Sequence, residues 1–332
     1  METRKVQITG GSTYVVSIPK SWARDHGIES GSEIALFPTQ SSIILEPVGS
    51  EDQLAEGTMD VTGLEGEHLE RAVITMYVSG FDIIRFTSET ISSEQRQSLR
   101  EAGQRLAGLE IIEETSETVV FQDLLNSSEL SVHRTVSRVR LIAKGMFEDS
   151  IDAIVGESDV SPDDIIQRDE DVDRMFAMVS RMFRSSLRNA RSEEKLGVSR
   201  EECFDYHTAA RQLERIADHA TKISDVSKDV DSLPEEVSSE LSEMSEEAME
   251  MVDSALEALL DVDDDDDATR LANEVLDSVP SIDDRSRELD KKVHDLDAQT
   301  AQRLGLVIDS IGRTADYGGN IAETALQSAA PR

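Results

Sequence analysis

The sequence has a single cysteine and no long hydrophobic run, and each shortage excludes a class of protein. Cys203 is the only cysteine among 332 residues, so the chain by itself can form neither a disulfide framework nor a cysteine-based zinc site. No stretch approaches the roughly 18 apolar residues that span a bilayer, and no apolar signal segment follows the N-terminus. We therefore expect a cytoplasmic protein with no direct membrane insertion.

Basic residues are also scarce. The chain has 33 Lys and Arg against 69 Asp and Glu, a formal net charge of −36. The hydrophobic fraction of 38% is compatible with folded domains, so this charge does not by itself indicate disorder. An evenly acidic surface keeps its hydration in concentrated salt, where screening is strong. The composition therefore indicates a salt-loving source, such as a halophilic archaeon.

The first of three regions, residues 1–48, is rich in short β-prone runs. We expect four strands and one short helix, at residues 5–8, 14–18, 33–37 and 42–46 and at residues 19–27. A unit this small exposes most of its surface when it folds alone. We therefore expect it to dimerise, with Val15, Trp22 and Ile44 buried against a second copy.

The second region, residues 55–125, alternates helix and strand and predicts a small α+β module. We expect helices at residues 64–78 and 93–106, a strand at 81–86 and a hairpin of residues 109–114 and 118–121. Nothing in it resembles a phosphate-binding glycine loop or a nucleophile motif. Its role is open at this point.

The third region, residues 128–332, is predicted to be helical throughout, with breaks that divide it into about six helices. The breaks fall at residues 156–161, 192–198, 232–234, 261–267 and around Ala298. Residues 211–225 align without a gap on residues 309–323, where Arg215, Ala217, Asp218 and Ile223 meet Arg313, Ala315, Asp316 and Ile321. This repeat predicts two three-helix bundles, at 128–230 and 233–328.

Each copy of the repeat carries an acidic ladder. Glu214, Asp218 and Asp225 lie close to one helix face in the first copy, and Asp309, Asp316, Asn320 and Glu323 do so in the second. Stacked carboxylates repel each other unless a cation lies on them, and magnesium, manganese or iron suits such ligands. The alternative is a solvated acidic face with an Arg–Asp pair. Roughly fourteen acidic pairs at this spacing arise by chance alone in so acidic a chain.

The repeated segments carry a resemblance to a known family. Residues 213–220 (LERIADHA) and 313–323 (RTADYGGNIAE) resemble the paired signature motifs of the PhoU family of phosphate-uptake regulators. The helix with Asp169, Val172 and Asp173 is similar to the family's second helix. The resemblance implies tandem three-helix bundles, metal-binding motifs on the third helix of each, and negative regulation of phosphate uptake through the transporter's ATPase and a signalling partner.

The resemblance also assigns site residues, and it assigns them unequally. Glu214 and Asp218 fill the family's Glu-x-x-x-Asp motif in the first copy. In the second copy Asp316 fills the aspartate position, whereas Gly312 stands where the glutamate belongs and Asp309 lies one turn earlier. We therefore expect a strong site for a divalent or iron-type metal ion in the first bundle and a weaker or absent one in the second.

Residues 1–48 resemble the AbrB-type swapped-hairpin DNA-binding domain. The resemblance is carried by residues 4–6 (RKV), 15–19 (VVSIP) and the helix that ends at Gly27 and Ile28. It implies interleaved hairpins in a homodimer and DNA contacts by basic residues, which here are Arg4, Lys5, Lys20 and Arg24. Tyr14 and Ala23 stand where arginine is common in the family. Since the region has four basic and five acidic side chains, a module for dimerisation alone is the alternative.

The sequence thus predicts a mostly α fold, a tandem pair of three-helix bundles preceded by a small swapped-hairpin β-barrel domain and a small α+β module. The leading functional hypothesis is a dimeric, metal-binding regulator of phosphate uptake that contacts DNA, the transporter, or both. The first alternative is an adaptor that acts only on the phosphate transporter ATPase. A metal-dependent hydrolase is a third reading, but no general base or nucleophile is apparent, so we expect no enzymatic activity.

Overall fold

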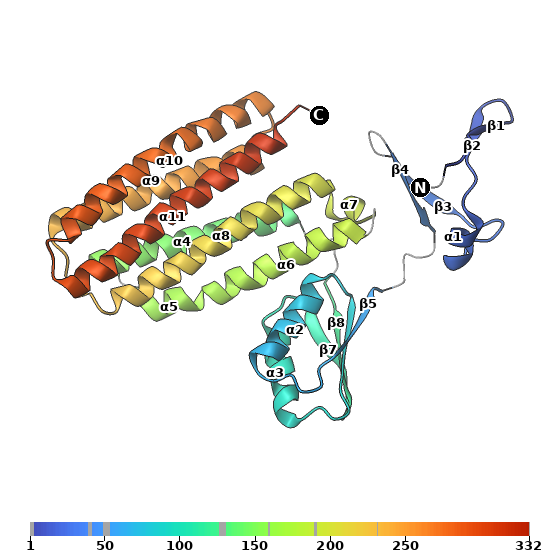
Figure 1. The fold of residues 1–332 in the computed structure, drawn as a ribbon, viewed down its shortest axis with the longest axis horizontal. Coiled ribbons are helices and arrows are strands. Elements are labelled where there is room, and N and C mark those ends of the chain that lie inside the picture. Colours follow the sequence, from blue (N-terminus) through green and yellow to red (C-terminus); the bar gives the residue numbers. More distant parts are fainter. Residues whose placement is uncertain are drawn as a thin grey trace. The chain divides into compact units, whose positions relative to one another are not determined.

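The fold was taken from a computed structural model of the chain (Figure 1). It describes residues 3–38, 42–48, 54–125, 131–158, 160–188, 191–230 and 232–331. The chain divides into two compact units, Met1–Leu54 and Ala55–Arg332. Most of the described residues are helical, as the sequence predicted.

The first unit consists of two β-hairpins with a short helix between them. Strand β1 (Gln7–Thr9) pairs antiparallel with β2 (Thr13–Val15), and β3 (Ile34–Pro38) pairs antiparallel with β4 (Ile43–Pro47). Helix α1 (Lys20–Asp25) follows Pro19, which suits a helix start. Gly27 after the helix has a φ of 64°, a conformation that glycine adopts without strain. The predicted strands and helix therefore form, with ends shifted by one to three residues.

None of the described residues in the first unit is buried. Its apolar side chains lie open to solvent, with exposed fractions of 74% for Tyr14, 65% for Ile8 and 62% for both Leu36 and Ile43. Leu36 pairs in register with Leu45, and Ile43 lies two residues from Leu45, so these three side chains share one face of the β3–β4 hairpin. The unit by itself therefore leaves an apolar surface uncovered.

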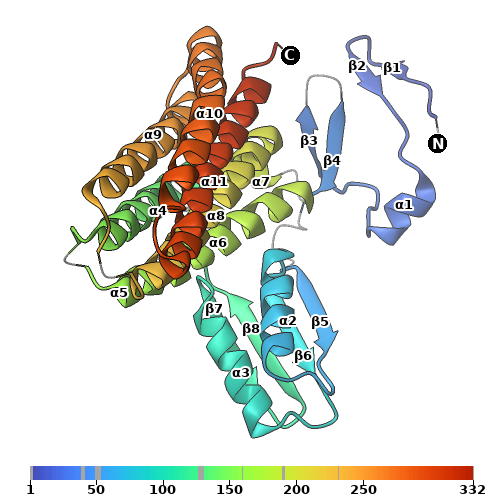
Figure 2. The same cartoon turned by 60° about the vertical axis from the view of Figure 1, so that its left-hand side comes forward.

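The second unit begins with an α+β module. Its elements follow the order β5 (Glu56–Asp60), α2 (Glu67–Val78), β6 (Ile83–Thr87), α3 (Ser93–Gln104), β7 (Leu109–Glu114) and β8 (Thr118–Asp123). The sheet order is β5-β6-β8-β7, in which only β5 and β6 run parallel. Figure 2 shows α2 and α3 lying against this sheet. Buried side chains such as Tyr77, Phe86 and Phe121 fill the space between the two layers.

Strand β5 was absent from the sequence prediction. Its residues, Glu56 to Asp60, include a glycine and only one large apolar side chain, so they lack the β-branched pattern of a strand. Gly57 is buried, and a Cβ there would lie 2.5 Å from Met76 Cε and 2.8 Å from the Phe81 ring. The strand therefore depends on close packing of its backbone under α2, which periodicity does not reveal.

The rest of the second unit is a pair of three-helix bundles, as predicted. Helices α4 (Val132–Val155), α6 (Asp169–Arg188) and α8 (Arg200–Ser227) pack together, as do α9 (Glu235–Leu260), α10 (Asp265–Val293) and α11 (Ala298–Ser328). Two short helices, α5 (Pro162–Gln167) and α7 (Arg191–Leu196), lie in the connections of the first bundle. Contacts of α8 with α11 and of α4 with α9 join the bundles around one continuous apolar core.

Short polar side chains begin several of these helices. Ser199 and Glu202 form a reciprocal capping box at the start of α8. Asp264 caps α10 by accepting hydrogen bonds of 3.1 Å from the N–H groups of Asp266 and Asp267. The acidic run Asp263–Asp267, which lies in a predicted break, therefore contains the start of α10, where acidic side chains are favourable.

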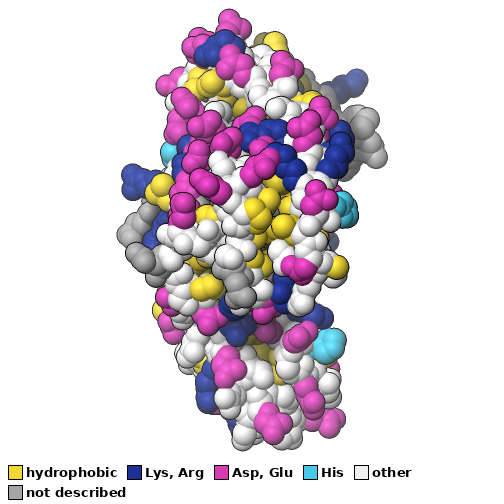
Figure 3. All heavy atoms as spheres, turned by 90° about the vertical axis from the view of Figure 1, so that its left-hand side faces the viewer, with side chains coloured by type: hydrophobic (Ala, Val, Ile, Leu, Met, Phe, Trp, Pro, Cys, Tyr) yellow, Lys and Arg dark blue, Asp and Glu magenta, His cyan; other side chains and the backbone are white. Residues whose placement is uncertain are grey.

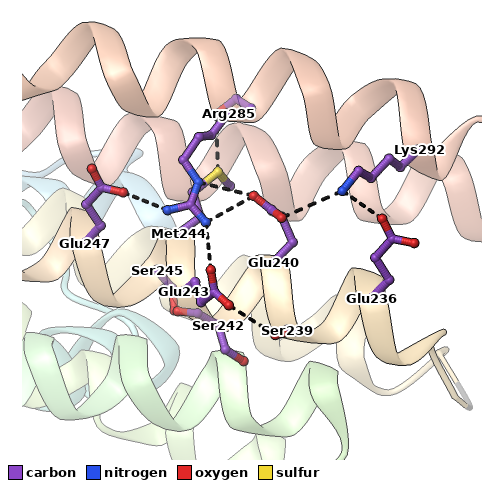
Figure 4. A network of polar contacts seen from close by, with 11 residues as sticks. Glu236, Ser239, Glu240, Ser242, Glu243, Met244, Ser245, Glu247, Arg285 and Lys292 are labelled. Carbon is purple, nitrogen blue, oxygen red and sulfur yellow. Dashed lines mark hydrogen bonds and ion pairs between the residues drawn. The ribbon is translucent and has the colours of Figure 1, made fainter.

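A network of charged side chains links α9 to α10 in the second bundle (Figure 4). Arg285 of α10 donates to Glu247 at 2.8 Å, to Glu240 at 3.0 Å and to Glu243 at 3.3 Å, all on one face of α9. Lys292 reaches Glu236 at 2.9 Å two turns further along α10. Two cations therefore cover a row of four glutamates that would otherwise repel each other.

The α+β module is fastened to the first bundle by Arg181 of α6. Its side chain is 8% exposed and donates to Asp123 at 2.8 Å, to Asp82 at 3.1 Å and to the backbone carbonyls of Tyr77 and Phe81 at 2.9 and 2.8 Å. Every one of these acceptors belongs to the module. Because the guanidinium is buried and fully bonded, it fixes the module on α6.

Charged side chains of both signs are interspersed on the face shown in Figure 3, with acidic ones in excess and hydrophobic ones gathered near its middle. In the part of the chain that the structure describes, no helix combines the length and the apolar character that a bilayer span requires.

Candidate functional site

Helices α6 and α8 bring four carboxylates to one place in the first bundle. The two helices pack antiparallel, so Asp169 and Asp173 near the start of α6 lie beside Glu214 and Asp218 in the second half of α8. We call these four side chains the carboxylate cluster. The sequence predicts Glu214 and Asp218 as ligands, whereas Asp169 and Asp173 lie on a helix that it marks only as similar to the family's second helix.

Burial and mutual repulsion change the acidity of the carboxylate cluster. Burial, then the neighbouring Asp173 and Asp218, raises the pKa of Asp169 to about 7. Burial also raises the pKa of Glu214 to about 7, with Asp218 adding to the effect and Arg211 opposing it. The pKa of Asp173 is raised by loss of solvation and by Asp218. A proton or a cation is therefore stabilised among these carboxylates near neutral pH.

Two oxygens of the carboxylate cluster lack partners. Asp169 Oδ1 and Glu214 Oε2 are buried, and neither accepts a hydrogen bond from a described residue. The other oxygen of Glu214 accepts from Arg211 at 2.7 Å. A buried carboxylate oxygen without a donor is costly, so this donor set suits a hard cation such as magnesium, manganese or iron.

The side chains are not yet arranged as a coordination sphere. Across the described parts of the chain, no three His, Cys, Asp or Glu side chains converge closely enough to hold a metal ion. A cation bound at the carboxylate cluster would therefore have to draw the carboxylates of α6 and α8 toward one another.

Asp225 lies apart from the carboxylate cluster. It is two helical turns beyond Asp218, and its carboxylate pairs at 3.0 Å with Lys228, which also reaches Asp163 at 2.7 Å. His219, the neighbour of Asp218, faces α11 instead and bonds Ser310 Oγ at 2.9 Å. The acidic ladder predicted along α8 is thus divided, and α6 supplies the additional carboxylates.

The second bundle has a smaller acidic group on α11. Burial raises the pKa of Asp316, as do Asp283 of α10 and Asp309, whereas Arg313 opposes the shift. Arg313 lies 3.4 Å from Asp316 and 3.9 Å from Asp309. Here the predicted Arg–Asp pairing of the alternative reading is present, and one cation already partly balances both carboxylates.

Gly312 leaves the glutamate position of the second copy empty. A Cβ at this position would meet only Ser286 Oγ, at 3.6 Å, which is an ordinary contact. Glu323 is exposed on the last turns of α11, seven residues beyond Asp316. The two bundles therefore share a fold but differ in their acidic side chains.

The predicted DNA-contacting residues lie in the first unit. Lys20 and Arg24 are exposed and four residues apart on α1, so they share one helix face. Arg4 and Lys5 are exposed in the segment that precedes β1. The structure therefore places all four basic side chains at the surface of one small unit.

Comparison with known proteins agrees with this architecture. The chain is thus of the class of proteins built from two three-helix bundles in tandem, with carboxylates on α6, α8 and α11. The PhoU domain family matches residues 136–226 and 241–325, more than half of the chain, and the chain belongs to the PhoU family. This confirms the resemblance carried by the two signature motifs. Both matched segments begin inside a first helix and end in a third helix.

The N-terminal unit matches a second family. Residues 7–53 match the family described as antidote-toxin recognition MazE, bacterial antitoxin, which makes this a MazE/AbrB-like domain, as predicted. The crystal structure of PhoU from Pseudomonas aeruginosa is 17% identical, with a TM-score of 0.48, and the alignment covers 59% of this chain and 93% of that one. No curated protein sequence matches significantly.

Proposed function

We propose that this protein is a dimeric, metal-dependent regulator that lowers phosphate uptake, with an N-terminal domain that contacts DNA. The observation that carries the proposal is the paired match of residues 136–226 and 241–325 to the PhoU domain. The PhoU family is regulatory, and the MazE/AbrB-like unit is of a type suited to dimerisation and DNA binding. We place its action in the cytoplasm, where the transporter ATPase and DNA are both accessible.

The carboxylate cluster supports the metal arm of the proposal. Asp169, Asp173, Glu214 and Asp218 would hold the ion, and the two buried oxygens without donors would become ligands. The bound cation would supply positive charge that offsets the repulsion between α6 and α8. In the second bundle, Asp309, Asp316 and Glu323 would form a weaker site at most, because Gly312 supplies no carboxylate.

The exposed apolar face of the β3–β4 hairpin supports dimerisation of the first unit. Leu36, Ile43 and Leu45 are open to solvent, and burial against a second copy would remove this apolar area from water. A dimer would also bring together eight basic side chains, the Arg4, Lys5, Lys20 and Arg24 of each copy. Phosphate neutralisation supplies most non-specific affinity for DNA, so doubling the cations matters.

One observation favours the adaptor alternative. Residues 1–48 carry four basic and five acidic side chains, so the unit is not basic overall. A domain used only for assembly needs no basic surface. In that case the bundles would act on the phosphate transporter ATPase, and the first unit would only join two copies.

Phosphate uptake in cells that lack the protein tests the proposal and separates it from the alternative. We expect uptake to stay high in phosphate-rich medium without the protein and to fall when the full chain is restored. A chain with Lys20→Gln and Arg24→Gln should fail to restore low uptake if DNA contact is required, whereas Arg138→Gln on α4 should restore it. Full restoration by the double variant favours the adaptor. Unchanged uptake without the protein contradicts both.

A further inference from the structure

A cavity of about 470 Å³ lies between the α+β module and the first bundle. Its walls come from α2, the end of α3, α6 and one side chain of α8, and Figure 2 shows α2 beside α6. Ligand pockets for small molecules have volumes of about 300–1,000 Å³, so the size is suitable. The apolar part of the lining includes Ile74, Val78 and Ala177.

One stripe of α6 faces this cavity and changes character along its length. Asp173, Ala177, Ser180 and Arg184 follow at spacings of four, three and four residues, and all line the cavity. The apolar centre therefore passes into a polar end formed by Ser180 and Arg184, one turn apart. His207 of α8 joins this end, with its ring stacked on Phe176 at 5.6 Å and on Phe183 at 5.1 Å between centroids.

The polar end has donors without protein partners. Ser180 is only 5% exposed, yet its hydroxyl bonds no described residue. The ring nitrogens of His207 likewise form no hydrogen bond within the described chain, and Arg184 has no ion-pair partner there. Ser180 is buried, His207 is half-buried and Arg184 is exposed, so a ligand that enters from solvent could reach all three donors. An apolar pocket with a few convergent polar groups is the usual form of a small-molecule site. Burial, then Arg184 and Arg211, lowers the pKa of His207.

We infer that this cavity binds a small apolar carboxylic acid as its anion. The carboxylate would accept hydrogen bonds from Ser180, Arg184 and His207, and the apolar body would lie on Ile74, Val78 and Ala177. An arginine fork suits a planar carboxylate. The complete lining contains three arginines and three acidic side chains, so it favours one negative charge over a polyphosphate. The module that supplies α2 would thus serve as part of a ligand sensor.

Isothermal titration calorimetry of the full chain tests this site with octanoate and 3-phenylpropanoate as probes, each compared with its neutral amide. We expect at least one acid to bind saturably, and its amide to bind about tenfold or more weakly, because the amide lacks the charge that pairs with Arg184. Arg184→Gln should weaken binding of the acid by a similar factor, and Ser180→Ala by less.

Two further variants distinguish the cavity from binding elsewhere. Ile74→Trp places a bulky indole ring at a partly exposed position in the cavity wall and should abolish binding. Circular dichroism should show that this variant stays folded. Arg138→Gln removes an exposed arginine of α4 outside the cavity and should leave affinity unchanged. Failure of both acids to bind at millimolar concentration, equal affinity for acid and amide, or equal loss in the Arg184 and Arg138 variants overturns the inference.

Discussion

At the scale of single residues, burial and the neighbouring carboxylates disfavour the ionised form of the Glu214 carboxyl group. Its side chain is 12% exposed, one oxygen lacks a partner, and its pKa is raised to about 7 from an ordinary value of 4.5. A carboxyl with a raised pKa contributes full stability below its unfolded-state pKa and loses that contribution as the pH rises through the folded-state pKa. In metal-free protein, ionisation of Glu214 therefore destabilises the fold between pH about 4.5 and about 7.

Glu214→Gln should remove the part of this pH dependence that Glu214 causes, while the part due to Asp169 remains. We expect the metal-free variant to be more stable than the unmodified chain at pH 8, by on the order of 2 kcal/mol, and to lose the advantage at pH 4.5. Urea denaturation at the two pH values in the presence of a chelator measures the difference. Asp225→Asn, on the same helix but paired with Lys228, should show no such trend. An equal effect of both variants would show that the Glu214 carboxyl group is not the source of the pH dependence.

Asp218→Asn should lower metal content. If the carboxylate cluster binds a divalent or iron-type ion, loss of one of four carboxylates should reduce affinity by tenfold or more, roughly the effect of removing a charged ligand. Elemental analysis of purified protein, with manganese titration as a second readout, measures this. Asp225→Asn is the matched control. Equal metal in Asp218→Asn and in the unmodified chain would leave the acidic pattern as a charged surface.

The sequence identified only half of the carboxylate cluster as site residues. Glu214 and Asp218 are marked by their recurrence in the repeat, which is a local signal. Asp169 and Asp173 join them only because α6 packs antiparallel on α8, and their distance along the chain, about forty residues, hides this. Conversely, Asp225 has the sequence spacing of the predicted acidic ladder, but in the structure its carboxylate pairs with Lys228.

At the scale of elements, α6 has two attachments. Its first turns carry Asp169 and Asp173, and two turns after Asp173 the buried Arg181 grips the α+β module. The long helices were predictable because apolar residues recur every three to four positions along them. Strand β5 was not, because its glycine and acidic residues have the composition of a loop, and only Gly57 is buried, against Met76 of α2 and Phe81. The local sequence pattern thus predicts an element only where the residues of that element have the apolar periodicity of a helix or a strand.

Arg181→Leu should destabilise the junction between module and bundle. The change leaves Asp123, only 10% exposed, and two backbone carbonyls without their donor. Breaking a buried pair in this way costs about 3 kcal/mol or more, so we expect a clear fall in the denaturation midpoint. Hydrogen exchange should rise in β8 and α2. Arg138→Leu, at an exposed position of α4 that lines no part of the junction, should cost roughly 0.5 kcal/mol or less. Similar losses in both variants would contradict this assignment.

At the scale of the whole molecule, the uncovered apolar face of the first unit and the excess of acid each predict a property in solution. Leu36→Glu places a charge on the face shared with Ile43 and Leu45. We expect the chain to be a dimer and this variant to be a monomer in light scattering after size exclusion. Leu141→Glu changes a leucine of α4 that is 70% exposed and should leave the dimer intact. A monomeric unmodified chain would contradict the proposal.

The net charge of −36 predicts that salt stabilises the fold. Screening shortens the reach of repulsion from about 10 Å at 0.1 M to about 3 Å at 1 M salt. We expect the Tm to rise by roughly 5 °C or more between about 0.2 M and about 2 M potassium chloride, as scanning calorimetry would measure. A zwitterionic osmolyte such as glycine betaine, which screens no charge, is the control. A Tm that falls with salt would contradict this expectation.

The absence of a carboxylate at Gly312 means that the two bundles could not be exchanged without consequence. The two bundles match the same domain family, yet only the first carries the Glu-x-x-x-Asp pair on its third helix. Exchanging their order, or replacing the second with another copy of the first, would alter the number of acidic centres while keeping the architecture. Since a Cβ at Gly312 meets no obstacle closer than 3.6 Å, the shortest route to such a symmetric chain is the single substitution Gly312→Glu.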